Sequence, residues 1–136
     1  MPMRAAFLLP LALAACAALA NPLDPLPEGG GWRVTAIAGA PVPTGAEVTI
    51  ERPDSRGISG RAGCNRYGGQ ISATGARLKI GPLMATEMFC VDLMTVEQAF
   101  FAALDQVDSA RSTATGVELL AGDRVVITAT KQVRFP

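Results

Sequence analysis

Apolar and polar residues alternate in short runs between Trp32 and Thr130, and this pattern is interrupted only once. Alternation with a period of two buries one face of a β-strand, and residues 32–36 and 46–51 show it most clearly. Further strands are predicted at residues 58–62, 67–72, 77–80, 109–113, 117–121 and 124–130. Many short strands separated by glycine- and proline-containing turns predict a curved antiparallel sheet or a small barrel.

The interruption falls at residues 92–107, where apolar side chains recur at intervals of three and four. This spacing places them along one stripe of an amphipathic helix that packs against the sheet, so the predicted fold class is α+β. The stripe consists of Leu93, Val96, Phe100, Leu104 and Val107. The sequence allows two starting points for this helix. Either Asp92 is the N-cap, or Thr95 and Gln98 form a capping box.

The N-terminus resembles a secretory signal peptide. Arg4 precedes an apolar run at residues 5–15, which is shorter than the roughly 20 residues that a transmembrane helix needs. One interpretation is a lipoprotein signal of residues 1–15, with a lipobox at residues 13–16 and lipid attached to Cys16. The other is an ordinary signal of residues 1–20, cleaved before Asn21, in which Cys16 is discarded. We favour the lipobox because the residues after the apolar run stay apolar.

Residues 21–31 are rich in proline and glycine. Such a stretch does not form regular secondary structure, and we expect it to be a short tether between the membrane, or the cleavage point, and the folded domain. The domain itself is expected at residues 32–130, and the roughly 115 residues that remain after the signal suit one compact core.

Cysteine parity supports export. Once Cys16 is lipidated or removed, Cys64 and Cys90 remain, an even number for a compartment in which disulfides persist. A bridge between them is expected to stabilise the domain by about 3 to 4 kcal/mol. A catalytic or metal-binding pair of thiols is the competing interpretation, but the chain contains no histidine to complete such a site.

The charge composition disfavours two classes of partner. Twelve basic and twelve acidic residues balance, without a long run of either sign. Nucleic acids and anionic membranes select clustered lysine and arginine, so we expect neither nucleic-acid binding nor a polybasic membrane patch. A monomer with contact to the membrane only through a lipid anchor is expected.

Two motifs, and the spacing between them in the sequence, resemble the META domain of HslJ-like bacterial envelope proteins. The first is Gly-Cys-Asn-Arg-Tyr-Gly-Gly at residues 63–69, and the second is Thr-x-Met-x-Cys at residues 86–90, followed by Glu97. The motif residues are Gly60, Gly63, Asn65, Arg66, Tyr67, Gly68, Thr86, Met88 and Glu97. The resemblance implies an α+β domain with a barrel-like sheet and one helix, exported and often lipid-anchored. It implies no set of catalytic residues.

Each motif residue has a structural interpretation beside a functional one. The glycines mark sharp turns or close backbone approaches, because their spacing does not match a phosphate-binding loop. Asn65 and Arg66 could bind a ligand, yet an asparagine at a chain reversal more often bonds its own backbone, and we favour that role for Asn65.

Met84, Met88 and Cys90 suggest a site for Cu(I). We favour the alternative that these methionines, beside Phe89, fill gaps in an apolar core, and we expect no metal and no cofactor. Three carboxylates precede or enter the helix, and nothing in their spacing makes them converge. They are Glu87, Asp92 and Glu97.

We therefore expect an outer-membrane lipoprotein facing the periplasm, or a soluble periplasmic protein if it is cleaved before Asn21. It would act without catalysis, in stress tolerance or envelope maintenance. Two alternatives stay open. An internal cavity lined by Val48, Ile50 and Phe100 would favour a carrier of an apolar ligand or lipid. An exposed apolar patch would favour an inhibitor or assembly factor for a periplasmic protein.

Overall fold

A computed structural model of the chain describes residues 1–3, 5–6, 8, 10 and 20–133, so Cys16 lies outside the described residues. The folded part begins near residue 21, and the described residues contain one helix, α1. The elements in chain order are β1 Gly31–Ile37, β2 Ala40–Pro41, β3 Thr49–Glu51, β4 Gly57–Arg61, β5 Arg66–Thr74, β6 Arg77–Ala85, α1 Met94–Gln106, β7 Ser109–Ser112, β8 Gly116–Ala121 and β9 Arg124–Lys131.

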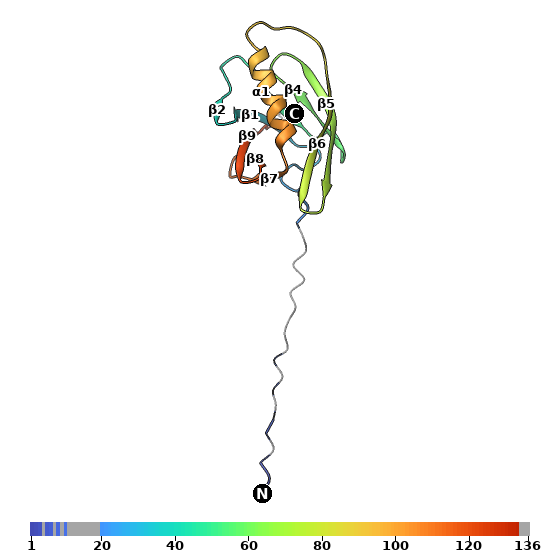
Figure 1. The fold of residues 1–136 in the computed structure, drawn as a ribbon, viewed down its shortest axis with the longest axis vertical. Coiled ribbons are helices and arrows are strands. Elements are labelled where there is room, and N and C mark those ends of the chain that lie inside the picture. The colour runs from blue at the N-terminus through green and yellow to red at the C-terminus, as the bar shows by residue number, and fades with distance from the viewer. Residues whose placement is uncertain (4, 7, 9, 11–19, 134–136) are drawn as a thin grey trace.

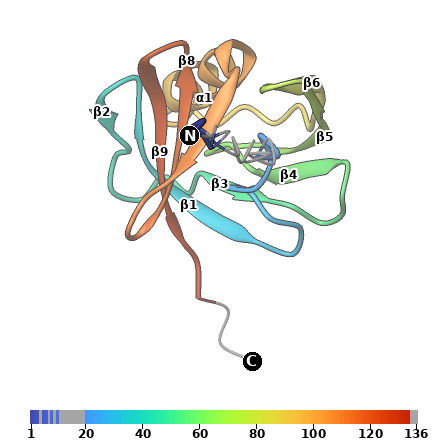
Figure 2. The ribbon, with the colours of Figure 1, turned by 90° about the horizontal axis from the view of Figure 1, so that it is seen from below.

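The strands form one curled antiparallel sheet in the order β6-β5-β4-β3-β1-β9-β8-β7, with β2 paired to β1 (Figure 2). The two ends of the sheet approach each other, because the N–H of Leu78 in β6 donates to the carbonyl of Asp108 just before β7, at 3.0 Å. This arrangement confirms the predicted α+β fold with a curved sheet and one packed helix.

The alternation in β1 is confirmed at Trp32 and Val34, which are buried; the register then shifts between Val34 and Ala36, and Ile37 is the next buried residue. Strand β6 runs beyond the predicted end at Ile80 and continues to Ala85, through a cis peptide bond between Gly81 and Pro82. Glycine and proline are unusual inside a strand, but the pairing with β5 resumes beyond them at Gly69 and Leu83.

Helix α1 lies on the inside of the curled sheet (Figure 1), and its apolar stripe belongs to the buried core or packs against it. Phe100 and Leu104 are fully buried, and Phe100 meets Tyr67 edge to face with ring centroids 5.4 Å apart. Both predicted caps are wrong: the N-cap is Leu93, and it makes no side-chain hydrogen bond to the helix. No helix among the described residues is long and apolar enough to cross a membrane.

The expectation that residues 21–31 are only a tether needs correction. The segment preceding β1 contains turns rather than strands, but Leu26 is fully buried in the core. The guanidinium of Arg52 donates to the carbonyl of Leu26, and further backbone bonds join Arg52 to Gly29 and Gly30. The proline and glycine content correctly indicates a lack of regular structure, but it does not reveal that one leucine inserts into the core. These residues belong to the domain.

Arg52 is itself buried, and its guanidinium donates to four backbone carbonyls: those of Leu26, Asp54, Ser55 and Gly57. Burial lowers the pKa of Arg52, while the charges of Glu28 and Asp54 act in the opposite direction. The side chain therefore joins the N-terminal segment to the turn between β3 and β4.

Candidate functional site

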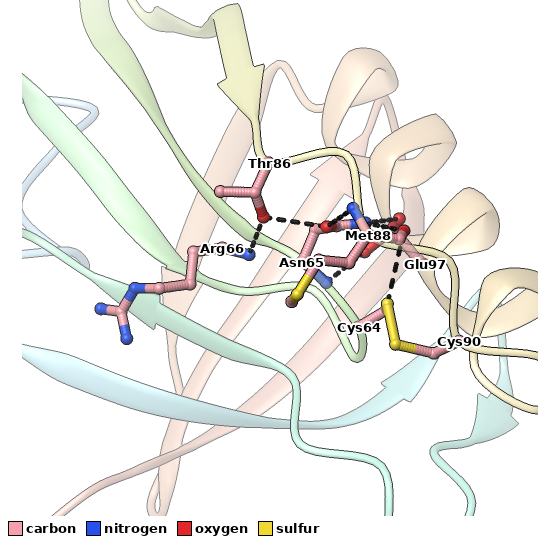
Figure 3. The surroundings of a disulfide bond; sticks show 7 residues. All are labelled: Cys64, Asn65, Arg66, Thr86, Met88, Cys90 and Glu97. Carbon is pink, nitrogen blue, oxygen red and sulfur yellow. Dashed lines mark hydrogen bonds between the residues drawn. A yellow bond between two sulfur atoms is a disulfide. The ribbon is translucent and has the colours of Figure 1, made fainter.

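The turn between β4 and β5, residues 62–65, meets the segment between β6 and α1, residues 86–93, at one end of the barrel (Figure 3). A disulfide joins the two, with the Cα atoms of Cys64 and Cys90 5.7 Å apart and a separation of 26 residues in sequence. This is the bridge that cysteine parity predicted. Cys64 Sγ also lies 3.6 Å from the carbonyl oxygen of Met88, a contact without a proton because the sulfur is oxidised.

Asn65 is buried beside the bridge and makes a dense set of hydrogen bonds. Its Oδ1 accepts from the N–H of Met88 at 2.7 Å and from Oγ1 of Thr86 at 2.8 Å. Its Nδ2 donates to the carbonyl of Met88 at 3.0 Å and to Oε2 of Glu97 at 2.8 Å. The predicted bond to its own backbone is wrong, because the side chain instead binds a segment more than twenty residues away.

Glu97 lies on the buried side of α1, and its carboxylate accepts from Asn65 through both oxygens. Oε1 receives the backbone N–H of Asn65 at 2.7 Å, and Oε2 receives the side-chain amide. A buried carboxylate is costly unless hydrogen bonds satisfy it. Glu97 therefore does more than favour the positive end of the helix dipole: it links α1 to the turn through Asn65.

The glycines of the first motif permit this turn. Gly63 adopts a φ of +99°, a left-handed conformation that side chains disfavour. At Gly60, an added Cβ would lie 2.2 Å from the backbone oxygen of Thr49, so β4 could not approach β3 as it does. Tyr67 is buried, and its hydroxyl donates to that same carbonyl at 2.8 Å.

Four large apolar side chains lie exposed at the end of β6 and along the segment after it, which the disulfide and Asn65 hold. Their exposed fractions are 82% for Met84, 54% for Met88, 78% for Phe89 and 80% for Val91. The expectation that Met84 and Met88 fill the core is wrong: only the backbone of Met88 is held inside, and its side chain faces outward. We call these four residues the apolar loop set.

Among the described residues, the site brings together no acid, base and nucleophile. Glu87 and Asp92 are exposed, whereas Glu97 is buried and already bonded to Asn65. The described part of the chain also holds no group of three or more cysteine or acidic side chains that could bind a metal ion. The arrangement can position a loop and present its side chains to a partner.

Thr86 and Arg66 occupy the rim of the site. Oγ1 of Thr86 accepts the backbone N–H of Arg66 at 3.1 Å, while the Arg66 side chain points away from the network (Figure 3). Gly68 lies on β5 next to Met84 of β6. The family motif therefore combines residues that build the network with residues that face outward.

Sequence reasoning missed the joint role of Asn65 and Glu97, and it missed Arg52. The signal was faint in each case: one carboxylate within a mostly apolar stripe, and one arginine beside a proline and a turn. Neither pattern reports which distant segment will supply the partner atoms.

Comparisons with known proteins agree with the resemblance in the motifs. Residues 24–133 match the META domain. An NMR structure of a protein from Burkholderia xenovorans superposes with a TM-score of 0.67 at 26% identity, covering 98% of this chain and 100% of that one. A second NMR structure shares the fold, with a TM-score of 0.58 and 20% identity over 76% of this chain and 89% of that chain. A search of curated proteins returns no match. The chain belongs to the META domain family.

Proposed function

We propose that this protein acts without catalysis, by binding another protein through the apolar loop set. The observation that carries the proposal is the combination of exposure and rigidity. Met84, Phe89 and Val91 are each about four-fifths exposed, yet the backbone between them is fixed by a disulfide and by Asn65. Exposed apolar surface is unfavourable in water, and a pre-ordered loop loses little entropy on binding.

We further propose that the protein is exported and lipid-anchored through Cys16, and that the partner serves stress tolerance or envelope maintenance. The apolar run with its lipobox-like end supports export. The chain before β1 enters the domain at one end of the sheet, whereas the segment that follows β6 lies at the opposite end (Figure 1). An anchored domain would thus present the loop away from its attachment point.

The packing of the core gives no support to the alternative that the protein carries an apolar ligand or lipid inside the sheet. Val48, Ile50 and Phe100 are fully buried within the core, where neighbouring side chains surround them. The cleft of about 620 Å³ beside α1 lies elsewhere, between Ala99, Ala103 and Val126. Binding at a surface therefore has more structural support than binding inside the sheet.

The test is capture from envelope extract with the full-length protein as bait and mass spectrometry of both proteins and lipids. The matched bait carries Phe89→Ser and Val91→Ser, which change exposed side chains without touching the Asn65 contacts. We expect a protein that the wild type retains and the variant loses. Equal capture by both baits, or specific recovery of lipid alone, would refute the proposal.

Lipid attachment is tested separately by Cys16→Ala. We expect this variant to appear in the soluble fraction or to accumulate unprocessed. Unchanged processing with Asn21 at the mature N-terminus would establish ordinary secretion, and it would leave the binding proposal intact.

A further inference from the structure

Two arginines face each other across the hairpin of β4 and β5, next to the apolar loop set. Arg61 and Arg66 are direct partners in the antiparallel register. Their neighbours Gly60 and Tyr67 face the core and are buried, so alternation places both arginines on the outer face. Side chains in such a pair have Cβ atoms about 4.5–5.5 Å apart.

The ion pairs among the described residues do not include either guanidinium. They join Arg77 to Asp108 and Arg111 to Glu118. On the β3 side, the backbone N–H of Arg61 donates to the neutral hydroxyl of Thr49. Like charges directly opposite in a sheet repel each other, so this pair is unfavourable in the isolated protein.

The nearby carboxylates leave room for an anion from outside. Glu87 and Asp92 belong to the exposed segment after β6, and the exposed Glu47 lies next to Gly63 of the turn; none of the three forms an ion pair with a described residue. Glu51 shares the outer face, one row further along and opposite Ser59, and has contacts of its own. An anion that approaches the hairpin can therefore lie between two positive charges of one sheet row.

The register also joins the arginines to an apolar neighbour. Met84 of β6 is the partner of Gly68 on β5, two residues from Arg66. The diagonal positions of such a ladder lie about 7–8 Å apart, on the same face. Gly68 has no side chain and leaves the surface between Arg66 and Met84 flat, which permits close approach by another chain.

We propose that this outer face, formed by Arg61, Arg66 and Met84, binds a segment of the protein partner that carries carboxylates beside an apolar side chain. A carboxylate between the two guanidinium groups relieves their repulsion through charge-assisted hydrogen bonds. The apolar side chain packs on Met84 and the rest of the apolar loop set. This inference rests on the proposed function and adds the chemistry of the partner.

The test is selection of a phage-displayed library of random dodecapeptides on the full-length protein. Selected peptides are then synthesised, and their affinity is measured by fluorescence anisotropy. We expect them to pair Asp or Glu with Leu, Phe or Trp. Replacing their acids with Asn or Gln should weaken binding at least tenfold, as should Arg61→Gln with Arg66→Gln in the protein.

A matched control removes two cations from the other end of the same face, through Arg77→Gln and Lys79→Gln. This variant should bind the acidic peptides as the wild type does. Because all four changed side chains are at least partly exposed, the fluorescence of Trp32 should show unchanged folding. An NMR titration that shifts the Arg66 side-chain N–H signal on addition of an acidic peptide gives a second, independent readout.

Several outcomes would overturn the inference. The library could yield peptides without acidic residues, or no peptides at all. The control variant could lose as much affinity for the acidic peptides as the Arg61→Gln, Arg66→Gln variant does. The arginines could also prove necessary for binding phosphatidylglycerol vesicles rather than peptides. Failure of this inference is distinguishable from failure of the proposed function. Peptides that need Phe89 but not the arginines would refute only the charge argument, whereas indifference to Phe89 and Val91 would refute the binding surface itself.

Discussion

At the scale of single residues, Asn65 uses the full hydrogen-bonding capacity of its side chain. Two acceptor positions and two donor positions all find partners, in Thr86, Met88 and Glu97. No buried side-chain nitrogen or oxygen among the described residues lacks a partner. A network satisfied to this degree loses more than one bond when any member changes.

Asn65→Asp should therefore lower the free energy of unfolding by about 3 kcal/mol or more, because it removes both amide donors and places a second carboxylate against Glu97. Urea titration followed by the fluorescence of Trp32 measures this, since the chain contains a single tryptophan. Combining Asn65→Asp with Glu97→Gln should restore part of the loss, because glutamine can donate. Glu87→Gln is the exposed control and should stay within about 0.5 kcal/mol. A loss below about 1 kcal/mol for Asn65→Asp would contradict the assigned network.

Tyr67 makes stability depend on alkaline pH. Burial, and secondly the charge of Glu51, raise the pKa of Tyr67 above its ordinary range. The unfolded phenol loses its proton near pH 10 while the folded one retains it, so the contribution of Tyr67 to stability is intact below about pH 10 and then falls by about 1.4 kcal/mol per pH unit. Tyr67→Phe should flatten this fall above about pH 10, at the cost of the bond to Thr49. Thermal midpoints on either side of that pH compare the two proteins, and parallel curves would contradict the assignment.

At the scale of elements, the segment between β6 and α1 is held twice. The disulfide fixes Cys90, and Asn65 independently fixes the backbone of Met88. The two restraints act on different parts of the folding equilibrium: the bridge restricts the unfolded chain, whereas the hydrogen bonds order the folded loop.

Replacing both cysteines, Cys64→Ala with Cys90→Ala, should lower the free energy of unfolding by about 3 to 4 kcal/mol. The Met88 amide should still be protected from hydrogen exchange, because its acceptor is Asn65 Oδ1. Urea titration and exchange measured by NMR test the two parts separately. Non-reducing peptide mapping of the wild type should first recover the linked peptides. Loss of Met88 protection in the double variant, with folding intact, would show that the bridge alone orders the loop.

The sequence predicts elements more reliably than it predicts their connections. Alternation in β1 and the stripe of α1 are direct consequences of burial, so Trp32 and Phe100 could be placed in the core from spacing alone. The continuation of β6 beyond Ile80 could not be predicted in this way, since Gly81 and Pro82 normally stop a strand. The exposure of Phe89 was equally hidden, because a short apolar stretch looks the same whether it is buried or presented to a partner.

At the scale of the whole molecule, the domain extends further toward the N-terminus than composition indicates. Leu26 completes the core at the end where β1 begins, and Arg52 holds it there. The N-terminal segment and the apolar loop set lie at different places on the barrel, so the stability contributed by one does not depend on contacts of the other.

Removal of residues 1–20 should leave the free energy of unfolding unchanged, whereas removal of residues 1–29 should lower it by about 2 to 4 kcal/mol. The larger loss reflects the burial of Leu26, worth about 1.5 to 3 kcal/mol, and the carbonyl acceptor lost to the buried Arg52. Urea titration of the two truncated forms measures the difference. Leu23→Ala, at a partly buried side chain, should cost less than Leu26→Ala. Equal stability of both truncated forms would return residues 21–29 to the role of a tether.

The contact between Asn65 and Met88 involves only main-chain atoms of Met88. The amide and carbonyl that Asn65 recognises are present in every residue except proline, which lacks the amide. The exposed side chains of Phe89 and Val91 take no part in this contact, so substitutions at these two positions are largely invisible to the folded framework. Natural variation can accumulate there without loss of stability, so relatives that share this framework are free to diverge in what they recognise while keeping the turn, the bridge and the buried glutamate.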